Sequence, residues 1–234
     1  FSLADTAEFE LGYQALIRFS ATMLFYLLIL NLLRTREHFR IALGLFVLGC
    51  GAMLLLHLFG TMSIWLKFLA KRNPREFFVQ IKDVLVTAFS TSSSSATLPA
   101  ALAACRERLG IAPSTAGFVM PLGTTMNMSG TALYEGCVVL FVAQVFGVHL
   151  GFIEQVTLVF LSVLSAVAVA AIPGGSLPLI AGLLVAFGIP PEGIGIILGV
   201  DRLLDMTRTM TNVGSDLVTT AVVDRGQRAS GHAG

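Results

Sequence analysis

One segment near the carboxyl end of the chain carries charged and amide side chains within apolar surroundings. Within residues 195–223 these are Asp201, Asp205, Arg208, Asn212 and Asp216. At about 100° per residue of an α-helix, the five fall within an arc of roughly 80°, with Thr209 at its edge. A charge inside a bilayer costs about 2.5–3.5 kcal/mol on insertion scales, so this polar stripe must face protein, water or a ligand.

The residue types of the polar stripe favour binding of a small zwitterion. Arg208 offers a planar fork that suits a carboxylate, and Asp205 can take an ammonium group. Asp216 and Asn212 supply hard oxygens, which suit Na⁺ better than a transition metal. Together with the hydroxyls and backbone amides of the serine run 92–95, this chemistry indicates an acidic amino acid as the ligand.

Two alternatives start from the same residues. In a purely structural network, Asp205 and Arg208 pair at i,i+3 spacing, and Arg202 offsets the like charges of Asp201 and Asp205. In a membrane-embedded hydrolase, a serine of 92–95 would need a base and an oxyanion hole. His57 is the only histidine in a clear apolar span and no G-x-S-x-G elbow occurs, which disfavours the hydrolase.

The elements that must position the polar stripe include two interrupted apolar segments. Residues 155–191 are 37 residues without a charge, broken at Pro173-Gly174-Gly175. One helix of that length would measure about 55 Å, too long for a bilayer core, so we expect a hairpin of two short helices. Residues 77–105 repeat the pattern, with a break at Ser90–Ser95 and a helix that restarts at Thr97-Leu98-Pro99. Two full spans joined by a loop are the alternative for each segment.

A third interruption, Asn127–Thr131, divides another apolar helix. Irregular backbone at membrane depth is tolerated only where protein or a watery cavity covers it. Paired interrupted segments are the best sequence indication of a transporter binding site. A kink that serves only helix packing is the alternative at this third break.

Composition places these segments in a membrane protein. The chain has 234 residues, 55% hydrophobic and 12% charged, against about 25% charged in soluble domains. Residues 16–33 form an apolar stretch with one charge, and residues 41–66 contain no Asp, Glu, Lys or Arg. The net charge of +1 and scattered basic residues give no indication of a nucleic-acid partner. The three cysteines are far apart, which predicts neither a disulfide framework nor a zinc site.

The basic residues predict which ends of the expected membrane spans face the cytoplasm. The positive-inside rule predicts that Lys67–Arg75, Arg106/Arg108 and Arg225/Arg228 are cytoplasmic, with Arg34–Arg40 on the opposite side. The first residue is Phe1, so we interpret the chain as trimmed or partial.

Four motifs resemble the dicarboxylate/amino acid:cation symporter family, the glutamate transporter superfamily. They are Ser92–Pro99 (SSSSATLP), Asn127–Glu135 (NMSGTALYE), Ala171–Gly175 (AIPGG) and Asp201–Asp216. The resemblance covers about residues 75–224. It implies an all-α integral membrane protein, with an elevator-type transporter core that has two re-entrant helical hairpins and a discontinuous helix. It further implies a homotrimer in the complete protein, and a multi-pass location in the cell (inner) membrane.

The resemblance also implies where the domains of the chain begin and end. N-terminal transmembrane helices would occupy residues 1–75, the transport domain 76–224, and a cytoplasmic tail 225–234. Within the transport domain it implies four units: a hairpin at 76–108, a broken helix at 112–148, a hairpin at 152–189 and the last helix at 192–224.

Roles for single residues follow only from the resemblance. The substrate-binding residues would be Ser93, Ser94, Thr131, Asp205, Arg208, Thr209 and Asn212. The gate would be formed by Ile172, Pro173, Gly174, Gly175 and Ser176. One Na⁺ site would use Gly123, Asn127, Asn212 and Asp216. The chain departs from the family pattern at Ser129, which replaces an acidic residue of another Na⁺ site.

The expected function is a symporter for glutamate or aspartate that is driven by Na⁺ or H⁺. It is expected to be no enzyme and to need no cofactor other than the coupling ion. A C4-dicarboxylate symporter is an alternative, but Asp205 argues against it because a dicarboxylate has no ammonium group. A partial or degenerate fragment that does not transport is the remaining alternative.

Overall fold

The structure, a computed structural model, describes residues 36–230. The apolar stretch 16–33 and the last four residues of the expected tail lie outside this part. Residues 36–230 contain helices and connecting turns and no strand, which confirms the all-α prediction for them.

The first described helical run is long enough to cross a bilayer. It consists of α2 (Arg36–Leu56), a π-helical turn η1 (His57–Thr61) and α3 (Met62–Phe68). By length and composition, Glu37–Phe68 and Pro113–Val145 are both candidates for membrane spans. Large apolar side chains are exposed along several helices, among them Leu48, Phe118 and Ile153, and soluble monomers rarely expose so many together.

The serine run lies at the turn of a helical hairpin. Helix α4 (Pro74–Thr91) starts with Asn73 as its N-cap, and α5 (Ser94–Glu107) follows after only two residues. Ser92 adopts a left-handed conformation at φ 51°, and the Ser93 hydroxyl accepts a hydrogen bond from the amide of Ala96 at 3.2 Å. The predicted restart at Thr97 was therefore three residues late, because the Ser93 cap already satisfies the first turn of the helix.

The other two breaks also fall at or beside the predicted positions. Helices α6 (Pro113–Met126) and α7 (Ser129–Val145) are separated by Asn127 and Met128. Helices α8 (Phe152–Ala168) and α9 (Leu177–Ala186) are joined by the segment 169–176, which we call the gate loop. A short 3₁₀ turn, η2 (Pro191–Gly193), leads into the last helix, α10 (Ile194–Ala229).

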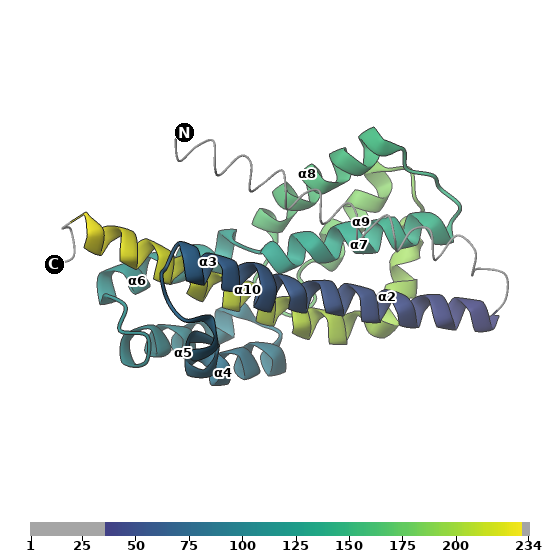
Figure 1. The fold of residues 1–234 in the computed structure, drawn as a ribbon. Coiled ribbons are helices and arrows are strands. Elements are labelled where there is room, and N and C mark those ends of the chain that lie inside the picture. Colours follow the sequence, from purple (N-terminus) through teal and green to yellow (C-terminus); the bar gives the residue numbers. More distant parts are fainter. Residues whose placement is uncertain (1–35, 231–234) are drawn as a thin grey trace.

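Helix α10 is the axis of the molecule, with α2 running parallel to it and the α6–α7 pair antiparallel (Figure 1). The Thr211 hydroxyl of α10 donates to the carbonyl of Leu54 at 3.4 Å. On the other side, the amide of Ala112 donates to Asp224 at 2.9 Å and that of Gly130 to Asn212 at 2.8 Å. This register brings the α6–α7 break alongside residues 212–216.

The last helix extends beyond the predicted boundary at residue 224. Arg228 pairs with Asp224 at 2.9 Å, an i,i+4 ion pair, and donates to the carbonyl of Gly110. Arg225 donates to the carbonyl of Leu69. These contacts pack the last turn of α10 against the loop after α3 and the loop after α5.

The basic segments assigned to one side of the membrane lie together. Arg72 donates to the carbonyl of Leu109 at 2.8 Å, so the loop after α3 meets the loop after α5, and both meet the end of α10. The start of α2 lies at the far end of the molecule (Figure 1). This arrangement agrees with the orientation that the positive-inside rule predicts for these segments.

Candidate functional site

The polar stripe faces the interior of the protein. The relative exposure of its five side chains is 7% or less, although all are polar or charged. The inward orientation that the helical spacing predicts is therefore confirmed. Arg202 is exposed and lies off the stripe, so it does not serve as the buried counter-charge to Asp201 and Asp205.

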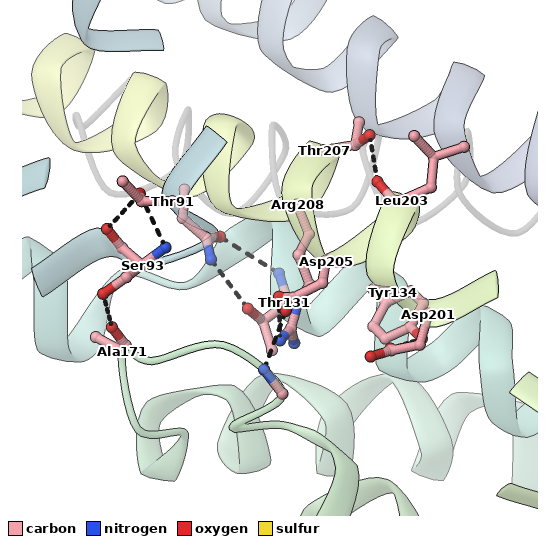
Figure 2. Close-up of polar contacts among 12 residues, drawn as sticks. Thr91, Ser93, Thr131, Tyr134, Ala171, Asp201, Leu203, Asp205, Thr207 and Arg208 are labelled. Atoms are coloured by element: carbon pink, nitrogen blue, oxygen red, sulfur yellow. Dashed lines mark hydrogen bonds and ion pairs between the residues drawn. The ribbon is translucent and has the colours of Figure 1, made fainter. Parts of the chain in front are cut away.

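Asp205 and Arg208 form a buried ion pair at the centre of the stripe (Figure 2). Oδ1 of Asp205 accepts from Nη2 of Arg208 at 2.7 Å and from Nε at 2.8 Å. Nη1 of Arg208 is buried and has no hydrogen-bond partner among residues 36–230. A buried donor without a partner carries a desolvation cost of about 1–3 kcal/mol, or more when it is charged, which an incoming acceptor would relieve.

The gate loop closes against this ion pair and against the serine turn. The amide of Gly174 donates to Oδ2 of Asp205 at 3.0 Å. The Ser93 hydroxyl donates to the carbonyl of Ala171 at 2.9 Å, as Figure 2 shows, so the turns of the two hairpins touch. Of the remaining predicted gate residues, Ser176 is fully buried and Ile172 is exposed.

Asn212 and Thr131 join α10 to the start of α7. Oδ1 of Asn212 accepts from the amides of Gly130 and Thr131, at 2.8 and 3.3 Å, and Nδ2 donates to the Thr131 hydroxyl at 3.0 Å. A side chain at position 130 would place its Cβ 2.8 Å from the carbonyl oxygen of Arg208, so only glycine permits this approach. Ser94 and Thr209, the other predicted substrate residues, are buried.

Three of the four predicted Na⁺ ligands meet at the α6–α7 break. Nδ2 of Asn127 donates to Oδ1 of Asp216 at 2.9 Å. A Cβ at Gly123 would lie 2.7 Å from the same oxygen, so this glycine leaves room for the carboxylate. Oδ2 of Asp216 is buried without a partner in the described part of the chain. Asn212 lies one helical turn before Asp216. Oδ2 of Asp216, a hard oxygen without a hydrogen-bond partner in the described residues, is a suitable ligand for a small cation.

The predicted site residues did not include two buried acidic side chains of this region, Asp201 of the polar stripe and Glu135. Oδ1 of Asp201 accepts from the hydroxyl of Tyr134 at 2.5 Å, and the guanidinium of Arg208 lies 5.3 Å from the centre of the Tyr134 ring. Glu135 is fully buried beside Ser165, and neither of its carboxyl oxygens makes a well-formed hydrogen bond within residues 36–230. The sequence could have indicated Glu135 as a functional residue, because it is a lone charge in an apolar helix.

A further contact links the start of α7 to the π-helical turn η1. Nε2 of His57 lies 3.2 Å from the hydroxyl of Ser129, the first residue of α7. Ser129, at the position where the resemblance implies an acidic residue, therefore contacts an imidazole from the π-helical turn η1. The sequence placed His57 in a span but gave no indication of this partner, which is 72 residues away.

Comparison with known proteins identifies the relatives of the chain. Residues 16–226 match the sequence profile of the sodium:dicarboxylate symporter family. Excitatory amino acid transporter 4 of Rattus norvegicus is 38% identical over 182 residues, 78% of this chain and 32% of that protein. The neutral amino acid transporter B(0) of Mus musculus is 36% identical over 176 residues, 75% of this chain and 32% of that protein. The proton/sodium-glutamate symport protein of Bacillus subtilis is 37% identical over 150 residues, 64% and 35% of the two chains.

The match covers most of this chain but about one third of each relative's length. The names of these relatives describe transporters rather than enzymes. The resemblance drawn from the four motifs is confirmed by the profile match.

Proposed function

This chain belongs to the sodium:dicarboxylate symporter family, and we propose that its helices hold the substrate and cation sites of a symporter for acidic amino acids. Family membership places the chain in a membrane. Because the chain spans about one third of its relatives, the transport activity is a proposal for the complete protein.

The unpaired donor of Arg208 carries this proposal. Asp205 binds two of the three guanidinium nitrogens, and Nη1 remains buried and available. In a low-dielectric interior, a carboxylate at Nη1 makes a charge-assisted hydrogen bond, which is stronger than a neutral one. A neutral side chain would leave this charged donor without an acceptor, so the arrangement favours a substrate with an acidic side chain.

Asp205 takes the substrate's ammonium group in this proposal. Its Oδ2 is held by the amide of Gly174, so an ammonium competes with the gate loop for the same oxygen. Substrate entry then requires the gate loop to leave Asp205 and the serine turn. A dicarboxylate would separate Gly174 from Asp205 without supplying a donor in return, which favours the amino acid over the C4-dicarboxylate.

The second carboxylate of the substrate binds between the serine turn and the start of α7. Ser93 supplies a hydroxyl that at present donates to Ala171, and Ser94 is buried beside it. Thr131 and Asn212 satisfy each other in this structure. A carboxylate near them would take the Asn212 amide and the Thr131 hydroxyl as donors.

Two carboxylates offer places for coupling ions. Asp216, with Gly123 and Asn127 beside it, provides hard oxygens for Na⁺. Glu135 is the second, because a buried carboxyl group without well-formed hydrogen bonds is stable when it carries a proton. We assign Na⁺ to the first and H⁺ to the second.

The proposal extends to the setting of the site in the membrane. The hairpins α4–α5 and α8–α9 enter the bilayer from opposite sides as re-entrant hairpins, and their turns meet at the polar stripe. In the complete protein, a multi-pass homotrimer of the cell (inner) membrane, the helices from α4 to α10 move as the elevator-type transport domain against a separate scaffold.

Uptake into proteoliposomes by the complete protein tests the function. Labelled aspartate is offered with Na⁺ and proton gradients imposed one at a time. We expect accumulation with at least one gradient and competition by glutamate. Competition by succinate as strong as by glutamate would support the dicarboxylate alternative. Absence of accumulation under both gradients would contradict the symporter proposal.

A further inference from the structure

Basic side chains from three distant segments of the chain gather where α3, α5 and α10 end. Arg72 donates to the carbonyl of Leu109 at 2.8 Å, which joins the loop after α3 to the loop after α5. Arg225 of α10 donates to the carbonyl of Leu69 in the first of these loops. We give the name basic patch to the three segments together, residues 67–76, 106–108 and 224–228.

The basic patch has an excess of positive charge. Its residues include eight Lys or Arg side chains and three Asp or Glu side chains. Two of the eight are neutralised by ion pairs, Arg228 with Asp224 at 2.9 Å and Arg108 with Asp83 at 2.8 Å. Four others are exposed and form no ion pair within residues 36–230, namely Lys67, Lys71, Arg75 and Arg106. The patch therefore keeps a positive charge that an anionic partner can neutralise.

The basic patch begins where a candidate membrane span ends. Glu37–Phe68 is long and apolar enough to cross a bilayer, and Lys67 lies in its last turn. Phe68 and Leu69 beside it are 67% and 46% exposed, and Trp65, the one tryptophan of the chain, is half-buried in the same turn. Tryptophan is enriched at membrane–water interfaces, where basic side chains meet lipid phosphates. The patch therefore lies at the depth of the lipid headgroups.

We propose that the basic patch binds the headgroups of anionic phospholipids in the membrane surface that it faces. Clusters of about four to eight Lys or Arg side chains directly beyond a span are typical of such binding. Exposed Phe68 and Leu69 supply apolar contacts to the lipid next to these charges. The inference uses the membrane setting of the family and is independent of the proposed substrate and coupling ions.

Two arginines of the basic patch are oriented before any lipid binds. Arg72 and Arg225 are half-buried, and Nη1 of each is held by a backbone carbonyl of a neighbouring loop. The other guanidinium nitrogens remain for a phosphate, whose oxygens match the planar fork of arginine. Exposed Lys71 and Arg106 add charge on either side of the contact between the two loops.

Lipid titration of the complete protein in detergent tests the inference without any transport measurement. Fluorescent phosphatidylglycerol is compared with phosphatidylcholine that carries the same label. We expect tighter binding of phosphatidylglycerol, and weaker binding as the salt concentration rises, because salt screens exposed charges.

Removal of single charges should change this binding in a predictable direction. A basic side chain near an anionic surface contributes about 5-fold in affinity, so Lys71→Gln should weaken phosphatidylglycerol binding about 5-fold. The double variant Lys71→Gln/Arg106→Gln should weaken it about 25-fold. Glu107→Gln removes a negative charge from the patch and should strengthen binding instead.

Arg202→Gln is the matched control, because it removes an exposed positive charge of α10 outside the basic patch. It should bind phosphatidylglycerol as the wild type does, and thermal unfolding verifies that each variant is folded. Equal binding of the two lipids by the wild type, or unchanged binding by Lys71→Gln/Arg106→Gln, would overturn the inference. Displacement of the lipid by an equal concentration of inorganic phosphate would also overturn it, because the site would then bind a soluble anion.

Discussion

The backbone amide of Gly174 donates a hydrogen bond to Oδ2 of Asp205, with 3.0 Å between the two atoms. This bond ties the gate loop to the charged centre of α10, because the other oxygen of Asp205 holds Arg208. In the proposed function, the gate and the substrate site therefore share the carboxylate of Asp205. A ligand that needs Asp205 must displace the loop, and removal of the ligand allows the loop to return.

Covalent closure of the gate loop should stop transport. In the double variant Ser93→Cys/Ala171→Cys, the thiols replace a contact in which the serine hydroxyl lies 2.9 Å from the Ala171 carbonyl. A disulfide there fixes the turns of the two hairpins together, so aspartate uptake should be lost after oxidation and restored by a reductant. Ser93→Cys alone serves as the control, and full uptake by the oxidised double variant would argue against the gate.

Loss of the Arg208 guanidinium should remove acidic substrates selectively. Charge-assisted hydrogen bonds contribute about 1.5–3 kcal/mol. Arg208→Ala should therefore lower kcat/KM for aspartate about 10- to 150-fold, while a neutral amino acid such as serine becomes a better relative substrate. The comparison variant is Arg202→Ala, since this arginine is exposed on the same helix. Unchanged aspartate uptake by Arg208→Ala would refute the assigned role.

A methyl group at position 130 should separate α7 from α10. In Gly130→Ala the new Cβ meets the carbonyl oxygen of Arg208 at 2.8 Å and the amide oxygen of Asn212 at 3.0 Å. Forcing atoms into a packed interior costs about 1–3 kcal/mol, so thermal unfolding should occur at a lower temperature. Gly117→Ala in α6 is the control, because nothing lies within 4 Å of its Cβ, and it should unfold at or slightly above the wild-type temperature. Equal unfolding temperatures would show that the helices separate easily.

Neutralising Asp216 should abolish Na⁺ binding at the α6–α7 break. Asp216→Asn keeps the shape of the side chain and the place beside Asn127 but removes the negative charge. We expect the wild type to be stabilised against thermal unfolding by Na⁺ relative to choline, and the variant to lose this stabilisation. Asp83→Asn, at an exposed position, should behave as the wild type does. Persisting Na⁺ stabilisation in Asp216→Asn would place the ion elsewhere.

Neutralising Glu135 should remove the proton dependence of uptake and leave the Na⁺ dependence. Glu135→Gln is nearly isosteric, and an amide tolerates the buried position beside Ser165 without binding a proton. Aspartate uptake driven by a proton gradient is the measurement. Exposed Glu37→Gln in α2 is the control. A response to the proton gradient that survives in Glu135→Gln would exclude this carboxyl group as the proton site.

Local patterns in the sequence determined the helices, their breaks and the face of α10. Proline, glycine and serine interrupt helices through their own backbone preferences, so the breaks at 173 and 92 are local properties. The polar stripe follows from helical periodicity and the high cost of exposing charge to lipid. Its burial in the structure confirms this reasoning. The predicted helix limits at Thr97 and residue 224 differ from the observed limits at Ser94 and Ala229. A serine cap and an ion pair determine the observed limits.

Only the tertiary structure decided which groups meet and which remain unpaired. The contacts Ser93–Ala171 and His57–Ser129 join residues 78 and 72 positions apart, and no local pattern specifies such partners. The availability of Nη1 on Arg208 also depends on contacts from several helices at once. Sequence periodicity gives the direction in which a side chain points. Whether its atoms are satisfied depends on the partners that packing brings within hydrogen-bond distance.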